Sequence, residues 1–218
     1  MAASEVEICN LALGRIGWTD LLEDTGATLE ELANSLRNPS SEQSRLHYAR
    51  ARDFTLGRWW WPFAKVREAL AVVAGETRPD WAYVYAYPAN AVKVRYVTLP
   101  GVRTPRPDQI PPTRIEARRD ASGTVTGRLI LCDQVDAEIC YTARVANVAA
   151  FPQDFEDALV ANLAARLAMP LVKGVEGGRL MRECLQEFEV LWRTAAAAAA
   201  NEEKDDPEPD GEILASRR

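Results

Sequence analysis

Three consecutive tryptophans, at positions 59 to 61, stand at the end of a helical pattern and directly before Pro62. Three adjacent indoles point in three directions about a helix axis, so one helical face packed against one core cannot bury them all. At least one of them must meet a second layer of structure. We therefore interpret Trp59, Trp60 and Trp61 as the joint between a helical layer and another part of the fold, and as candidate interface residues.

Apolar residues at helical spacing predict two helices before this joint. The first starts at the capping box Ser4-Glu-Val-Glu7 and ends at Gly17. The second runs from Ser40 until the proline, which cannot donate a backbone hydrogen bond. Residues 18–39 are expected to form a loop with at most one short helix. Residues 63–73 fit a short helix or an extended strand, and the helix is preferred.

Helical spacing returns after residue 152. A long apolar stripe predicts a helix that ends at Pro170. Gly174, Gly177 and Gly178 then predict a hinge. A last helix is expected from about Arg179 into the six alanines at 195–200, because alanine has the highest helix propensity.

Between the helical parts, the sequence alternates in the manner of antiparallel strands. We expect about five strands, at residues 81–87, 91–99, 114–119, 127–132 and 136–145. In Trp81-Ala-Tyr-Val-Tyr-Ala-Tyr87 the four aromatic residues should share one face, and packing is favoured over stacking of nucleic-acid bases. If residues 133–136 join a symmetric hairpin, Cys132 faces Ala137 and Cys140 faces Leu129, which excludes a disulfide between the two cysteines.

The layout predicts an α+β fold in which a small antiparallel sheet or open barrel is inserted into a helical bundle. Residues 1–75 and 150–200 would form the discontinuous bundle, and residues 76–149 the inserted β subdomain. Residues 201–218 would be an extended acidic tail, whose composition cannot bury enough surface to fold alone. We expect a partner or a neighbouring copy to bind this tail, with Ile213 and Leu214 as candidate contacts.

A projecting loop is predicted between residues 100 and 112, because five prolines cannot enter a β ladder. Arg103 and Arg106 lie in this loop and are candidate interface residues. Another partner-facing feature is therefore expected on the inserted β subdomain.

The charge distribution argues against a protein that grips DNA. The chain carries a net charge of −6, but residues 1–200 hold 25 acidic and 23 basic side chains, so the body is close to neutral. A duplex-binding protein needs a basic excess to release counterions from phosphates. The acidic amino terminus does not fit a signal peptide, and no apolar run is long enough to cross a membrane. We expect a soluble, intracellular protein without membrane contact.

No catalytic, cofactor-binding or metal-binding motif stands out. The four cysteines are far apart and fit buried reduced thiols, and His47, the only histidine, fits a structural role. Asp53 lies within two helical turns of Arg50, Arg52 and Arg58. This spacing fits a partly buried ion-pair network at the joint or a plain exposed pair. We expect a structural protein and not an enzyme.

Four residue patterns in a fixed order carry a family resemblance. They are Glu7-Ile-Cys-Asn-Leu-Ala-Leu-Gly-Arg-Ile-Gly17, then Tyr48-x-x-x-Arg52-Asp53-x-x-Leu56 with Trp60 or Trp61 and Phe63-Ala64, then Trp81-x-Tyr83-x-Tyr85-x-x-Pro88, and last Phe155-x-x-Ala158-Leu159 with Leu163-Ala164 and Leu167-Ala168. The series spans residues 5–195 and resembles tail tubular protein A and the head-to-tail adaptor (connector) proteins of tailed bacteriophages and related gene transfer agents. Ala89-Asn90-Ala91 departs from the Asp-Cys often seen there in that family.

The resemblance implies a structural virion protein. Such proteins form an oligomeric ring, usually of twelve copies, under the portal protein in the neck of the particle, and the ring receives the tail nozzle or tail tube. The implied partners are the portal protein, the nozzle or tube protein and further copies of the chain, with genome DNA passing through the ring without specific binding. No cofactor is implied. The protein would be made in the cytoplasm of the bacterial host, and its carboxy-terminal tail would reach along the portal or a neighbouring subunit.

Two other functions stay open at this point. A helical DNA-binding or packaging factor, such as a small terminase subunit, would require a basic face. An enzyme with an unrecognised site would depend on Asp53 or His47.

Overall fold

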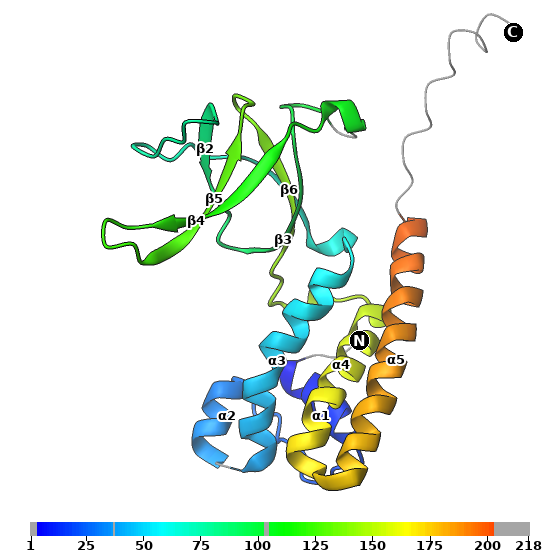
Figure 1. Cartoon of the computed structure of the whole chain (residues 1–218). Helices are drawn as coiled ribbons and strands as arrows, with labels where there is room; N and C mark the ends of the chain where they lie inside the picture. The colour runs from blue at the N-terminus through cyan, green and yellow to red at the C-terminus, as the bar shows by residue number, and fades with distance from the viewer. Residues whose placement is uncertain (1–3, 37, 103–104, 203–218) are drawn as a thin grey trace, which may run out of the picture.

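The computed structural model describes residues 4–36, 38–102 and 105–202, and within these residues the chain has an α+β fold. Helices form a bundle at one end of the molecule, and two small antiparallel sheets lie at the other end (Figure 1). All six strands of the described residues come between the third and fourth helices in the sequence. The sheets are therefore inserted into the helical bundle, which confirms the predicted fold class.

The bundle contains α1 (Glu5–Arg15), α2 (Leu29–Leu36), α3 (Pro39–Arg58), α4 (Gln153–Val172) and α5 (Gly174–Glu202). The Ser4 hydroxyl caps α1 by accepting a hydrogen bond from the Glu7 amide at 3.1 Å, as the capping box predicted. Most of α4 is buried, and it contacts α1, α3 and α5. Most buried residues of these helices form a large apolar core with Trp61 and Phe151, and Phe188 of α5 packs with α4 in a smaller cluster.

Helix α3 ends at Arg58, earlier than predicted. The residue before a proline disfavours the helical conformation, and Trp61 is extended ahead of Pro62. The Trp61 indole nitrogen donates to the Thr55 carbonyl at 3.0 Å. This bond satisfies one of the last carbonyls of α3, which have no partner inside the helix. The tryptophans therefore follow the helix instead of forming its last turn.

The turn between α4 and α5 is also shorter than predicted. Pro170 lies inside α4, which continues to Val172, so the expected end at the proline is wrong by two residues. Lys173 and Gly174 both have positive φ angles, of 61° and 60°, and together they reverse the chain. Gly177 lies inside α5 and does not belong to a hinge.

The strands form two sheets, in the orders β1-β6-β3 and β2-β5-β4. Their bounds are Lys65–Ala69 for β1, Tyr83–Ala86 for β2, Ala91–Thr98 for β3, Thr113–Arg119 for β4, Val125–Cys132 for β5 and Glu138–Ala143 for β6. Residues from both sheets share one buried cluster, which includes Tyr85, Ile130, Ile139 and Tyr141. The sequence predicts a small sheet or open barrel of about five strands, and the described residues form six strands in two small antiparallel sheets that pack through this cluster.

Three sequence expectations about the strands are wrong. The helix preferred at 63–73 is a short 3₁₀ turn (Pro62–Ala64) followed by β1, which pairs with β6 and so joins the sheets before residue 76. Strands β5 and β6 belong to different sheets and do not form a hairpin. Cys132 instead lies opposite Tyr83 and Thr113 in register.

The predicted aromatic face of the first strand is also only partly present. Trp81 precedes β2 and packs against Val84 in a separate small cluster, while the three tyrosines that follow pack in the shared core of the sheets. Tyr85 is fully buried, and its hydroxyl donates to the Gln134 carbonyl at 2.5 Å. Tyr85 is thus a packing residue.

Candidate interface at the joint of helices and sheets

The joint between the bundle and the sheets is formed by the residues that follow α3, and each tryptophan there meets a different environment. Trp61 is 2% exposed and belongs to the core of the bundle. Its ring lies edge-on to Phe155 of α4, with centroids 5.1 Å apart. Trp61 therefore anchors the end of α3 to α4.

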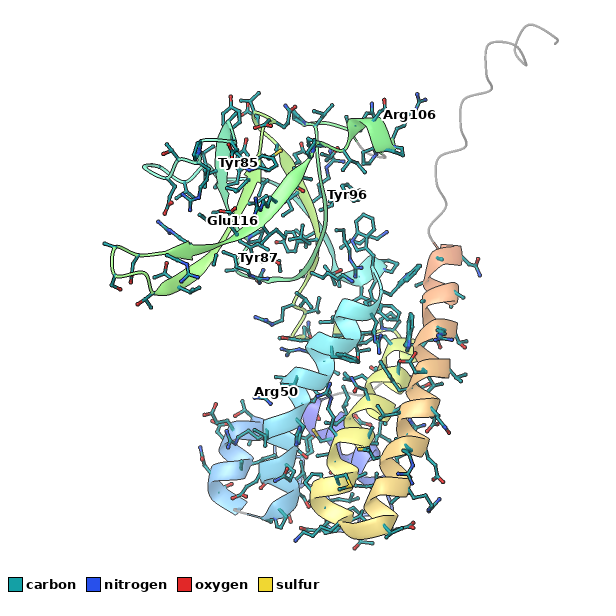
Figure 2. The ribbon with its side chains drawn as sticks, viewed as in Figure 1. Arg50, Tyr85, Tyr87, Tyr96, Arg106 and Glu116 are labelled. Atoms are coloured by element: carbon teal, nitrogen blue, oxygen red, sulfur yellow. The ribbon has the colours of Figure 1, made fainter. Side chains whose placement is uncertain are left out.

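Trp60 faces the sheets. Its ring lies edge-on to Tyr96 of β3, with centroids 5.4 Å apart and planes at 89°. The Lys65 ammonium lies 4.1 Å from the centre of the same ring, a cation–π distance. Figure 2 shows Tyr96 on the side of the sheet that faces the end of α3. Trp60 therefore joins the bundle to the sheet that contains β1 and β3.

Trp59 is the exposed member of the three. Its side chain is 39% exposed and borders a hollow of about 280 Å³ lined by Trp192 and by a small-residue stretch of α5. Arg95 of β3 donates a hydrogen bond to the Trp59 carbonyl. The backbone at this position is thus fixed to the sheet while the indole remains available for a partner.

Asp53 forms an ion-pair network across the joint. Its carboxylate accepts from Arg52 at 3.1 Å and from Arg144, on the segment that leaves β6, at 2.8 Å. The Arg52 side chain is only 9% exposed and also lies 4.0 Å from Glu5. The partly buried network is therefore the correct alternative for the pair of Asp53 and Arg52.

The other two predicted members of this network lie elsewhere. Arg58 pairs with Glu189 of α5 at 2.9 Å, and its guanidinium covers the rings of Phe54, Phe188 and Trp192. Arg50 is exposed and has no ion pair with any described residue (Figure 2). Arg50 and Arg58 are close to Asp53 in the sequence of α3. Their side chains point in other directions around the helix, so they do not reach its carboxylate.

The sequence pattern does not predict the role of Arg144. It is 91 residues away from Asp53 in the sequence, so no local spacing could reveal the pair. One signal was available, because Arg144 stands where the inserted strands return to the bundle. The chain leaves the bundle after α3 and returns to it after β6. A charged residue at one of these two places is a candidate partner for a charged residue at the other.

Four candidate interface residues lie outside the joint, and the structure describes one of them, Arg106. Arg106 is exposed at the start of a short 3₁₀ turn (Pro107–Gln109) at the far edge of the sheets (Figure 2). Arg103, Ile213 and Leu214 lie outside the described residues. The expected tail also begins later than predicted, because α5 continues to Glu202.

Several titratable groups of the bundle are buried and lie near one another, including Cys9, Tyr48 and Glu156. All four cysteines are free and buried, and burial raises the pKa of Cys9 to about 12, which keeps it in the thiol form. No group of three or more acidic, cysteine or histidine side chains that could hold a metal ion occurs in the described part of the chain. Across the same residues, no helix has both the length and the apolar composition needed to cross a membrane.

The sequence was compared with models of protein families and with curated proteins, and neither comparison finds a match.

Proposed function

We propose that this protein is a head-to-tail adaptor, a structural component that forms a ring between the portal and the tail nozzle or tail tube of a phage-like particle. The observation that carries the proposal is the ordered series of residue patterns over residues 5–195 together with the insertion of all described strands between α3 and α4. This is the arrangement that the family resemblance implies.

The surface of the molecule offers features that a ring subunit would use. A cyclic ring needs two different contact surfaces on each copy, because each subunit meets its neighbours head to tail. The exposed indole of Trp59 supplies an aromatic group of the kind enriched at interfaces. The loop that contains Arg106 supplies a second exposed feature, at the far edge of the sheets (Figure 2).

The long helix α5 fits the proposal as a rigid element. Its 29 residues extend about 44 Å at the usual rise of an α-helix. It flanks the bundle and leads toward the level of the sheets (Figure 1). A helix of this length can hold neighbouring subunits at a fixed separation.

A direct test is to mix the purified chain with its portal protein and image the product by cryo-electron microscopy, with mass photometry to give the number of copies. We expect a closed ring on the portal, with DNA able to pass through it. The absence of the chain from purified particles, or of any portal complex, would contradict the proposal.

Substitution of Trp59 tests the proposed contact surface. Trp59→Ala should weaken portal-bound assembly by about tenfold or more, the size of a moderate interface contribution. Leu21→Ala, at a side chain that is 49% exposed in the loop between α1 and α2, is the control and should leave assembly unchanged. Equal losses for both variants would remove Trp59 from the interface.

A further inference from the structure

Two hollows lined largely by apolar side chains lie along α5, one beside the end of α3 and one over α4 beside the middle of α3, and we call them together the α3–α5 groove. On α5 it consists of one stripe at helical spacing: Met181, Leu185, Phe188, Trp192, Ala196 and Ala200. On α3 it includes Phe54 and, just beyond the helix, Trp59. Phe54 and Leu185 are each 42% exposed, so the groove presents large apolar side chains to solvent.

The groove contains two hollows. The upper one is the 280 Å³ hollow beside Trp59. The lower one, of about 230 Å³, is lined by Phe54, Leu185 and both Met169 and Met181. The ring contact between Phe54 and Phe188, with centroids 5.9 Å apart, lies between them. The upper hollow lies near the carboxy-terminal end of α5 and the lower one nearer its start, and Arg58, paired with Glu189, lies over the rings between them.

Arginines accompany the aromatic rings along this path. The guanidinium groups of Arg58 and Arg166 lie 4.6 and 5.3 Å from the centre of the Phe54 ring, and Arg193 lies beside Trp192. Glu189 accepts from both Arg58 and Arg193 and so neutralises part of this charge.

The lower hollow keeps an excess of positive charge. Neither Arg166 nor Arg50 has an ion pair with a described residue. Burial, together with Arg166 and Arg50, lowers the pKa of His47, which also lines this hollow. The groove therefore fits a segment that combines carboxylates with a short apolar side-chain pair.

The chain itself contains such a segment. Residues 203–212 hold six acidic residues and one lysine, and Ile213 and Leu214 follow directly. The carboxylates of this segment complement the arginines of the groove, and its two apolar side chains complement the apolar residues that line the groove.

The length of this segment also fits. Leu185 and Met181 lie 17 and 21 residues before the end of α5, which corresponds to about 26 and 32 Å along the helix. The eleven residues from 203 to 213 can span at most about 36 to 40 Å. Ile213 can therefore reach the lower hollow of its own molecule.

We propose that the carboxy-terminal segment, residues 203–218, folds back along the α3–α5 groove of the same chain and places Ile213 and Leu214 in the hollow lined by Phe54, Met169, Met181 and Leu185. The tether favours the segment of the same molecule over that of a second copy, because it holds the segment at a high effective concentration. This inference does not rest on the proposed ring function, and the residues that it assigns to the segment are those of the lower hollow, which does not include Trp59.

Methionine NMR of the full chain tests the proposal. The chain has three methionines, and Met169 and Met181 both line the lower hollow, so a methyl-labelled sample gives two reporter signals there. A nitroxide is attached at Ser216→Cys, next to the apolar pair. The native thiols are buried, and burial raises the pKa of each of them, so the reagent should select the new cysteine. We expect the signals of Met169 and Met181 to broaden, and to recover when the nitroxide is reduced.

Substitutions in the segment and in the groove make the test specific. The double change Ile213→Ser and Leu214→Ser should abolish the broadening, and Arg166→Ser should reduce it. Arg179→Ser is the matched control, since Arg179 pairs with Glu176 and Glu183 and lines neither hollow.

Three outcomes would overturn the proposal. The first is the absence of broadening in the spin-labelled full chain. The second is broadening of equal size when the nitroxide and the methyl label are on different molecules, because a second copy would then supply the segment. Broadening that survives the change of both Ile213 and Leu214 would likewise exclude them as the residues that occupy the hollow.

Discussion

At the scale of single residues, the joint shows how three identical side chains acquire different roles. Trp61 is buried against Phe155, Trp60 lies against Tyr96, and Trp59 is partly exposed. Their identity and order were evident from the sequence, but nothing in the sequence distinguished them. Each role follows from which distant element the side chain contacts.

Substitution of the buried member should have the largest effect on stability. Trp61→Ala removes a fully packed aromatic ring and a hydrogen bond to the Thr55 carbonyl, and we expect it to lower the free energy of unfolding by about 3 to 5 kcal/mol. Trp59→Ala should lower it by less than about 1 kcal/mol, because its ring is partly solvated. Urea denaturation of both variants measures the difference, and similar losses would show that the assigned burial is wrong.

The Asp53 network should matter more for stability than the neighbouring exposed arginine. Asp53→Ala leaves the buried guanidinium of Arg52 with only a distant carboxylate, and we expect a loss of about 1.5 to 3 kcal/mol. Arg50→Ala should change stability by less than about 0.5 kcal/mol. The two variants are compared by thermal and urea denaturation. A larger loss for Arg50→Ala would disprove the network.

Buried Cys9 should make stability fall at alkaline pH. Burial raises its pKa to about 12, whereas in the unfolded chain a thiol titrates near pH 8.5. The folded state holds the proton more tightly, so this contribution is complete below about pH 8.5 and is lost as the pH rises toward 12.

The expected loss from Cys9 is up to about 1.4 kcal/mol per pH unit within that window. Denaturation of the natural chain and of Cys9→Ala between about pH 8 and pH 10 measures it. The variant should be less stable at the lower pH but should show the shallower decline. Parallel pH profiles would contradict the assignment.

At the scale of elements, the sequence located helices well but placed their ends less well. The capping box at Ser4 is local chemistry, and the predicted start of α1 is correct. The end of α3 was placed too late because the Trp61 indole, returning from beyond the helix, supplies a carbonyl with its partner. The glycines at 177 and 178 predict a hinge, whereas the structure places them in α5.

Substitution of these two glycines by alanine should change the stability of the protein in opposite directions. A methyl group at Gly178 would meet only side-chain atoms at 3.7 Å or more, so Gly178→Ala should raise stability by about 0.5 to 1 kcal/mol through helix propensity. A methyl group at Gly177 would lie 3.0 Å from the Ala168 carbonyl oxygen. Gly177→Ala should therefore destabilise the contact between α4 and α5. Thermal unfolding of both variants checks the sign, and equal shifts would refute the close approach of the helices.

At the scale of the whole molecule, the near balance of charge should limit binding to DNA. Residues 1–200 carry 25 acidic and 23 basic side chains, so few counterions can be released from a duplex. We expect duplex affinity in the non-specific range, about 10⁻⁴ to 10⁻⁶ M at physiological salt, or weaker. Electrophoretic mobility shifts over a salt series measure it. Tight binding with a steep salt dependence would instead favour the DNA-packaging alternative.

Local sequence pattern predicted the long helices, most of the strands, the insertion of strands into a helical bundle and the position of the joint at Trp59–Trp61. These follow from local periodicity, capping residues and prolines, which act within a few residues of the chain. The tertiary structure alone decided that the strands form two sheets, that Asp53 meets Arg144, and that Trp59 remains exposed. Strand pairing and ion pairs between distant residues depend on how complete elements pack, and that packing is not encoded in the spacing of any one segment.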